Sequence, residues 1–205
     1  YRSEISEDLP LSIVDDAAIA ALSDTVTPQG IVAHCRFVDV PVDEILASGP
    51  RLIAVCADVR DPGNAGTVVR CADAAGADAV LFGANSVDPY NPKAVRASTG
   101  SLFHVAIGID HDLPAMIERV RAHGVRVLAA DGAGPTDLFT AEADGLLAGP
   151  LAWLFGNEAW GLPDETLRIA DAAVAVPIYG RAESLNLATA AAVCLYSAAR
   201  AQRID

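Results

Sequence analysis

Short apolar runs alternate with amphipathic stretches along most of the 205-residue chain. Apolar runs bounded by glycine, proline or polar residues are typical of buried strands, and apolar residues spaced three or four apart are typical of helices. This alternation predicts an α/β domain whose mostly parallel sheet is flanked by helices on both faces. We expect strands at 52–57, 79–82, 103–107, 125–130, 151–155 and 173–176, and helices at 64–75, 93–98, 113–123, 164–169 and 187–200.

Residues 1–50 show a weaker pattern. It predicts a helix at 16–24, a strand at 31–37 and a helix at 42–47, followed by a linker marked by glycine and proline. A segment of this size makes a poor independent domain without disulfides. We therefore expect residues 1–50 to be the remnant of an N-terminal module with its linker, and residues 51–205 to form the main domain.

The composition limits the possible functions. Fourteen basic residues against 27 acidic ones give a net charge of −13. This balance argues against a protein that grips nucleic acid over its whole surface, although it allows a local basic patch. No apolar run approaches the roughly 20 residues of a membrane span, and the chain starts with polar residues rather than with a signal peptide. We expect a cytoplasmic protein that does not enter a membrane.

The cysteines and histidines give no sign of a metal site. The cysteines form no CxxC pair, and the histidines are scattered without metal-ligand spacing. Reduced, buried thiols and no bound metal are therefore expected. The residues concerned are Cys35, Cys56, Cys71, Cys194, His34, His104, His111 and His123.

Three segments rich in glycine and polar residues follow predicted strands, at 58–66, 154–163 and 176–187. Parallel α/β sheets bind ligands beyond the carboxyl ends of their strands. Glycine lets the backbone turn sharply and approach a ligand, and the free amides at a helix start favour an anion such as an RNA phosphate. These segments are the candidates for a functional site.

The first two segments also have a simpler structural interpretation. In the first, Asn64 caps a helix and Arg70 pairs with Asp73 at the next turn. In the second, Glu158 is a solvated side chain in a strand-to-helix turn. The glycine spacing matches neither a P-loop nor GxGxxG, so the chain lacks the signature of a nucleotide triphosphatase or a common dinucleotide enzyme.

The third segment holds more polar residues than capping requires. Either Ser184 or Asn186 can cap the last helix. Capping does not easily account for Glu183, Ser184 and Asn186 together, directly before an apolar helix. A functional role is therefore favoured for this segment.

The chain resembles the SpoU (TrmH) family of RNA methyltransferases in three motifs that stand in the family's order and spacing. They are NxGxxxR at 64–70, FGNEAWGLP at 155–163 and VPIYGRAESLNLATAAAVCLYSAAR at 176–200. One such motif is a weak signal, whereas three in series are specific. The likeness covers about residues 51–200, and residues 26–33 resemble the end of the RNA-recognition domain that often precedes this catalytic domain.

The resemblance implies an enzyme that uses S-adenosylmethionine to methylate a ribose 2′-hydroxyl in structured RNA. Ribosomal 23S RNA is the first expectation for the substrate and transfer RNA the second. The resemblance also implies an α/β fold with a C-terminal deep trefoil knot, and a homodimer with the site near the interface. Two alternatives stay open: a non-catalytic RNA-binding or cofactor-binding protein on the same scaffold, and a small-molecule enzyme such as a dehydrogenase.

The resemblance also assigns residues by matched motif position. The family's functional polar residues correspond to Asn64, Arg70, Glu158, Ser184 and Asn186. Backbone contacts to the cofactor are expected near Gly156, Val176 and Leu185, joined by Leu128 and Ala130 from an earlier strand. The basic residues expected to meet RNA are Arg60, Lys93, Arg96 and Arg181.

The family assigns activation of the hydroxyl to the arginine, here Arg70. A guanidinium stays protonated in proteins, so a role as base needs a large pKa shift. A charged Arg70 that holds the neighbouring phosphate and stabilises the developing alkoxide is physically easier. Trp160 and Tyr179 lie near the motifs, where they either stack on nucleobases or pack against the protein.

Overall fold

The structure is a computed structural model that describes residues 9–23 and 25–203. It divides into two compact units, residues 1–36 and 37–205. In the first unit, α1 (Asp16–Leu22) is capped by Asp15, which accepts the Ala18 N–H at 2.9 Å. This helix confirms the prediction for 16–24, although residue 24 lies outside the described residues.

The strand predicted at 31–37 is wrong. The described residues 31–37 form no strand, and both Ile31 and Val32 are 45% exposed. An extended segment becomes a strand only when a neighbouring strand accepts its main-chain hydrogen bonds. The apolar run satisfies the local pattern, but no strand pairs with it.

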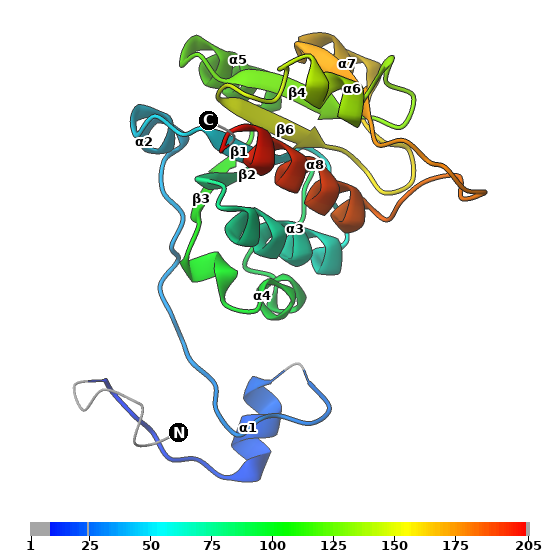
Figure 1. Ribbon diagram of the computed structural model, residues 1–205. Helices are drawn as coiled ribbons and strands as arrows, with labels where there is room; N and C mark the ends of the chain where they lie inside the picture. The colour runs from blue at the N-terminus through cyan, green and yellow to red at the C-terminus, as the bar shows by residue number, and fades with distance from the viewer. Residues whose placement is uncertain (1–8, 24, 204–205) are drawn as a thin grey trace. The chain divides into compact units, whose positions relative to one another are not determined.

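The second unit contains a seven-stranded sheet within residues 37–203, all of which the structure describes (Figure 1). Every strand pair is parallel, and the order is β3-β2-β1-β6-β4-β7-β5. The prediction of a parallel α/β domain is therefore confirmed. The strands are β1 (Leu52–Cys56), β2 (Ala79–Gly83), β3 (Ala106–Asp110), β4 (Arg126–Ala130), β5 (Thr136–Asp137), β6 (Leu151–Phe155) and β7 (Ala172–Ala175).

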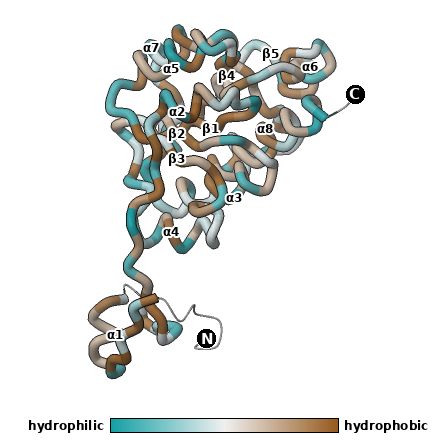
Figure 2. The backbone as a smooth tube through the Cα atoms, turned by 90° about the vertical axis from the view of Figure 1, so that its left-hand side faces the viewer, coloured by the Kyte–Doolittle hydropathy of each residue, from teal (hydrophilic) through white to brown (hydrophobic). Residues whose placement is uncertain are grey.

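Helices cover both faces of this sheet, and each face has its own hydrophobic core. One face packs against α3 (Pro62–Ala75), α6 (Leu138–Ala143) and α8 (Leu187–Ala201), with α4 (Pro92–Ser98) lying on α3. The other face packs against α2 (Val42–Ala47), α5 (Leu113–Ala122) and α7 (Asp164–Ile169). Figure 1 shows α3 and α8 side by side, and Figure 2 shows hydrophobic residues concentrated along β1 and β2.

Residues 37–50 belong to this second unit. The Tyr90 hydroxyl accepts the N–H groups of Val38 at 2.9 Å and Asp39 at 2.7 Å. Val42, Ile45 and Leu46 of α2 are buried in the core of the α5 face. The compact units therefore separate at residue 36, whereas glycine and proline predict a linker at the end of 1–50.

Most predicted elements are confirmed with ends shifted by one or two residues. The strand predicted at 103–107 deviates more, because Ser101–Phe103 form a 3-10 turn and β3 begins only at Ala106. The sequence pattern does not predict β5 and α6, which are short and follow one another directly. The expectation of buried thiols holds for Cys56 and Cys194, but Cys35 is exposed.

Candidate active site

The three candidate loops meet at one edge of the sheet. They follow β1, β6 and β7, and the loop after β4 joins them because β4 lies between β6 and β7. In a parallel sheet the carboxyl ends of neighbouring strands share an edge. A cavity of about 520 Å³ lies there, lined by residues 130–132, 155–159, 174–178 and 183–185 together with Gly161, Leu187 and Ala190.

A chain of side-chain hydrogen bonds connects all three motif loops. The Asn186 Nδ2 donates to the Asn64 Oδ1 at 3.1 Å, and the Asn64 Nδ2 donates to the Glu158 Oε1 at 3.2 Å. Their sequence separations are 122 and 94 residues. Helix capping does not require either hydrogen bond. These bonds instead bring the polar side chains of the three loops together.

Glu158 also holds the first loop in place. Its carboxylate accepts the main-chain N–H of Asp61 at 3.2 Å and that of Arg60 at 3.4 Å. Glu158 is exposed in a turn, as the simpler interpretation has it, but its carboxylate is also bonded to the first loop. The carboxylate lines the cavity and fixes the loop after β1 against the loop after β6.

The start of α3 differs from the prediction. Asp61, not Asn64, is the cap: its Oδ1 accepts the Asn64 N–H at 2.9 Å, and Pro62 occupies the first turn. The Asn64 side chain is thereby free to join the polar chain. The Asp61 carboxylate also accepts a hydrogen bond from the Lys93 Nζ at 3.0 Å. This bond, reinforced by the helix amides, lowers the pKa of Asp61.

Glycine has two distinct roles near the cavity. A Cβ on Gly156 would lie 2.4 Å from the Gly161 carbonyl oxygen, so the turn can close only without a side chain there. The Asn157 and Gly161 main chains exchange hydrogen bonds of 2.8 and 3.0 Å across this turn. Gly66 of the NxGxxxR motif instead faces α4, where a Cβ would lie 2.2 Å from the Ala94 carbonyl oxygen. Its role is helix packing rather than approach to a ligand.

The loop after β7 offers its main chain to the cavity. The N–H and C=O groups of residues 177–185 form no hydrogen bond with the described part of the chain. Ser184 and Leu185 line the cavity. Asn186 then caps α8 by accepting the N–H groups of Ala188 at 3.0 Å and Thr189 at 3.3 Å. One residue thus starts the helix and joins the polar chain.

The predicted cofactor positions are mostly brought together. Gly156, Val176, Leu185 and Ala130 all line the cavity. Leu128 does not, because its side chain is fully buried in the core of the α3 face. The carboxyl end of β4, rather than its centre, faces the site.

Arg70 does not line the cavity. It is exposed on α3, and its side chain forms no hydrogen bond or ion pair with any described residue. The alternative pairing with Asp73 is wrong, since the Asp73 Oδ2 contacts the His104 Nδ1 at 2.9 Å instead. The guanidinium is therefore available to another molecule.

The other basic residues differ in how free they are. The Arg60 Nε donates to the Asp58 Oδ1 at 2.8 Å, and its guanidinium lies 5.1 Å from the centre of the Trp160 ring. Lys93 is held by Asp61. Arg96 and Arg181 are exposed and unpaired among the described residues.

Sequence reasoning missed three residues that shape the site. Asp58 is 6% exposed and holds Arg60, while Asp61 caps α3. The Asn157 side chain donates to the Asp58 carbonyl oxygen at 3.4 Å and accepts the Ala159 N–H at 2.9 Å. The Asp-Pro pair at 61–62 is a recognisable helix-start signal, but no local signal marks Asp58 or Asn157.

Two further searches of the described residues give negative results. No helix in them is both long and apolar enough to cross a bilayer. No group of three His, Cys, Asp or Glu side chains in that part of the chain is arranged to hold a metal ion.

The fold and site define a parallel α/β protein with a small-molecule cavity at the carboxyl edge of its sheet. A family model of the SpoU rRNA methylases matches residues 51–196. The chain belongs to the SpoU rRNA methylase family and is a methyltransferase, as its three motifs predicted.

Known relatives agree with this assignment. The chain is 35% identical over 197 residues to the 23S rRNA (guanosine(2553)-2′-O)-methyltransferase RlmP of Bacillus subtilis, covering 95% of this chain and 74% of that protein. It is 38% identical over 149 residues to a 23S rRNA (uridine(2479)-2′-O)-methyltransferase of Streptomyces viridochromogenes, covering 70% of this chain and 50% of that protein. The AdoMet-bound rRNA methyltransferase from Sinorhizobium meliloti superimposes with a TM-score of 0.80 at 35% identity, covering 91% and 70% of the two chains.

Proposed function

We propose that this chain transfers the methyl group of S-adenosylmethionine to a ribose 2′-hydroxyl of 23S ribosomal RNA. The observation that carries the proposal is the hydrogen-bond chain from Asn186 through Asn64 to Glu158, which gathers all three motif loops beside one cavity. The activities in the names of the Bacillus and Streptomyces relatives support the reaction and the class of RNA.

The cavity fits the proposed cofactor. Its volume of about 520 Å³ falls within the range of roughly 300–1,000 Å³ usual for small-molecule sites. The free main-chain groups of the loop residues that line the cavity, 177–178 and 183–185, can hydrogen-bond an adenine edge. When bound, S-adenosylmethionine supplies a methyl group on a positively charged sulfonium. Glu158, Asp131 and Glu183 line the cavity and favour that positive charge.

The same charges disfavour a dehydrogenase. A dinucleotide carries a pyrophosphate, which proteins hold with basic side chains or with a glycine-rich helix start. Among the described residues that line the cavity there is no lysine or arginine, and three carboxylates are present. We therefore infer that a nicotinamide dinucleotide does not bind there.

The residues of the polar chain position the reacting groups. Asn64, Ser184 and Asn186 hold the loops and the incoming ribose in line with the methyl group, which is the main requirement for this type of transfer. Glu158 fixes the first loop through its main-chain N–H groups. Arg70, as a permanent cation, holds the adjoining phosphate and stabilises negative charge on the 2′-oxygen as it develops.

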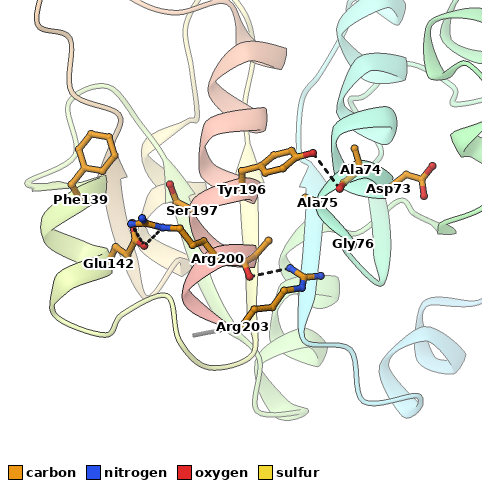
Figure 3. Close-up of a pocket in the computed structure, with 11 residues that line it drawn as sticks. Asp73, Ala74, Ala75, Gly76, Phe139, Glu142, Tyr196, Ser197, Arg200 and Arg203 are labelled. Carbon is orange, nitrogen blue, oxygen red and sulfur yellow. Dashed lines mark hydrogen bonds and ion pairs between the residues drawn. The ribbon is translucent and has the colours of Figure 1, made fainter. Parts of the chain in front are cut away.

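Arg70 lies outside the cavity of its own chain, which we explain by a homodimer. Gly63, Thr67, Arg70 and Ala74 recur every three or four residues and so share one side of α3. Arg70 and Ala74 on this side are exposed and can be reached by a second molecule. Beside it, the exposed Tyr196 of α8 donates its hydroxyl hydrogen to the Ala74 carbonyl oxygen at 3.2 Å (Figure 3). We propose that a second copy packs here and that Arg70 reaches the site of that copy.

Three further features belong to the proposal. The first unit belongs to an RNA-recognition domain, whose end residues 26–33 resemble. The C-terminal segment is threaded as a deep trefoil knot, which is supported by α8: it follows β7 but packs on α3, β1 and β6. The protein works in the cytoplasm, where ribosomal RNA is modified, and it needs no metal.

The test is transfer of labelled methyl groups from S-adenosylmethionine to transcripts of 23S rRNA, with transfer RNA as the comparison. We expect labelling of the 23S transcript at one ribose 2′-oxygen, located by mass spectrometry. Calorimetry with S-adenosylhomocysteine and NADH is the control, and only the former should bind. Labelling of transfer RNA alone would show that transfer RNA, rather than 23S rRNA, is the substrate. Binding without transfer to either RNA would make this a non-catalytic binding protein.

A further inference from the structure

The turn between β6 and α7 carries a large aromatic side chain that does not pack into the protein. Trp160 is 60% exposed, whereas Trp153, the only other tryptophan of the chain, is fully buried in β6. The Arg60 guanidinium from the loop after β1 lies over the Trp160 ring, 5.1 Å from its centre. Two loops thus contribute an exposed ring and a guanidinium to one surface.

Arg60 is held in this position through both its side chain and its main chain. The Arg60 Nε donates to the Asp58 carboxylate, whose side chain is only 8% exposed. The main-chain N–H of Arg60 points to Glu158 at 3.4 Å. The charge of Arg60 is therefore already paired, so the residue is poorly suited to hold a phosphate and well suited to present a planar face.

This surface is tied to the polar chain of the active site. Trp160 is two residues from Glu158, so their Cα atoms are at most roughly 7 Å apart. The main-chain pair between Asn157 and Gly161 closes the turn that holds both. A nucleotide whose ribose lies near Glu158 has its base within reach of the indole, because the base is bonded directly to that ribose.

We propose that Trp160 and Arg60 form a stacking platform for the base of the nucleotide that is methylated. Base stacking on an aromatic ring tolerates any base, because every base has a π-face, and an arginine extends the surface by cation–π contact. The inference rests on the proposed function and deepens it: the target nucleotide is turned out of its helix and held by its base while its ribose reacts. Trp160 is thus a substrate-positioning residue.

Kinetics with a 23S rRNA transcript tests the platform. Trp160→Leu keeps an apolar side chain but removes the ring, and it should raise KM for RNA about tenfold. The kcat and the affinity for S-adenosylhomocysteine should stay near the wild-type values. Trp160→Phe should restore most of the affinity for RNA. Tyr179→Leu is the matched control, since Tyr179 is 86% exposed on the loop after β7 and has no cation over its ring.

The salt dependence of KM separates stacking from phosphate binding. Loss of one phosphate contact lowers the slope of log KM against log salt by about 1. Arg60→Gln should raise KM a few-fold without changing this slope, because Asp58 already neutralises Arg60. A slope lowered by about 1 would make Arg60 a phosphate contact and overturn its part in the platform.

Tryptophan fluorescence gives a readout independent of catalysis. RNA should quench Trp160 and protect it from acrylamide, while the signal of the buried Trp153 persists in Trp160→Phe. Wild-type KM in Trp160→Leu together with unprotected Trp160 would overturn the platform while leaving the proposed reaction intact. Quenching by the transcript without methyl transfer by the wild type would overturn the proposed reaction alone. Neither quenching nor transfer would overturn both.

Discussion

The second unit has a groove that is larger than the cavity at the strand ends but has the less reactive lining. A groove of about 790 Å³ lies between α3, α6 and α8 (Figure 3). Both of its arginines are already paired: the Arg200 guanidinium contacts the Glu142 carboxylate at 2.6 Å, and the Arg203 Nη1 donates to the Ala199 carbonyl oxygen at 2.9 Å. The cavity at the strand ends is smaller, at about 520 Å³. It presents carboxylates, and also main-chain groups of the loop after β7 that form no hydrogen bond with the described part of the chain.

The comparison of the groove with the cavity indicates that free polar groups, rather than volume, identify the reaction site. A ligand gains hydrogen bonds only where the protein has left donors and acceptors unused. The groove instead presents the exposed rings of Phe139 and Tyr196, which suit contact with another protein surface. Changes at the cavity should therefore affect chemistry, whereas changes in the groove should affect only stability or assembly.

The largest effect is expected from Arg70→Ala. Because Arg70 lies outside the cavity, this variant is also the most severe test of the contrast between the cavity and the groove. Loss of a group that stabilises developing charge should lower kcat roughly 100-fold to 1,000-fold. The affinity for S-adenosylhomocysteine should be unchanged by calorimetry. Arg70→Lys keeps the charge but not the planar fork, and it should retain part of the activity.

Mixed dimers show whether Arg70 acts across the interface. Arg70→Ala subunits mixed with Asn186→Ala subunits should be more active than either variant alone, because one site of each proposed mixed dimer then has an intact cavity and an intact arginine. No recovery in dimers verified by mass spectrometry would place Arg70 in its own subunit's site.

The next effect is expected at Asn186, which both starts α8 and joins the polar chain. Asn186→Ala removes both functions, so we expect loss of about 1 kcal/mol of stability and weaker binding of S-adenosylhomocysteine. Asn186→Asp keeps the acceptor that caps α8 but cannot donate to Asn64. Thermal unfolding and calorimetry should therefore show near wild-type stability with impaired activity. Full activity in Asn186→Asp would mean that the link to Asn64 has no function.

The sequence predicts best those elements that have strong local signals. Helices 42–47 and 164–169 and strand 151–155 were predicted to the residue, because their periodicity and their flanking prolines and glycines are local signals. The placement of β6 next to β1 is not local, since it depends on pairing between segments almost 100 residues apart. The motif resemblance identified the polar residues, but only the fold joins Asn64 to its partners.

The limits of prediction are clearest at Asp61 and Arg70. The motif drew attention to Asn64 as a cap, although the Asp-Pro pair just before it supplies the actual cap. The motif groups Arg70 with Asn64, whereas a helix turns about 100° per residue and carries position 70 away from position 64. Which subunit uses a residue is a property of the assembly rather than of the sequence.

A smaller effect is expected at Asp61, which stabilises the first turn of α3 beside the cavity. Lys93 and the helix amides lower the pKa of this carboxyl below its unfolded value near 4. Its ionisation therefore stabilises the fold fully above about pH 4, and this stabilisation is lost as the pH falls through the lower folded value. Asp61→Asn keeps a capping oxygen without the charge. Urea unfolding should show the wild type more stable at pH 7, by less than about 1 kcal/mol because the pair is exposed.

That difference should shrink as the pH falls below about 4. A difference that persists unchanged at low pH would show that the charge of Asp61 is not its cause. Asp61→Ala should still lose about 1 kcal/mol below pH 4, because it removes the cap itself.

The smallest effect is expected in the groove, at the pair of Glu142 and Arg200. The Arg200 side chain is 68% exposed, so its contact with Glu142 should be worth at most about 1 kcal/mol. Glu142→Gln, Arg200→Gln and the double variant form a cycle whose coupling energy is read from urea unfolding. All three variants should bind S-adenosylhomocysteine within twofold of the wild type, because the groove and the cavity share no lining residue. A tenfold loss of affinity for S-adenosylhomocysteine in Glu142→Gln would show that the groove is coupled to the cavity. The distinction between a cavity for the reaction and a groove for protein contact would then be wrong.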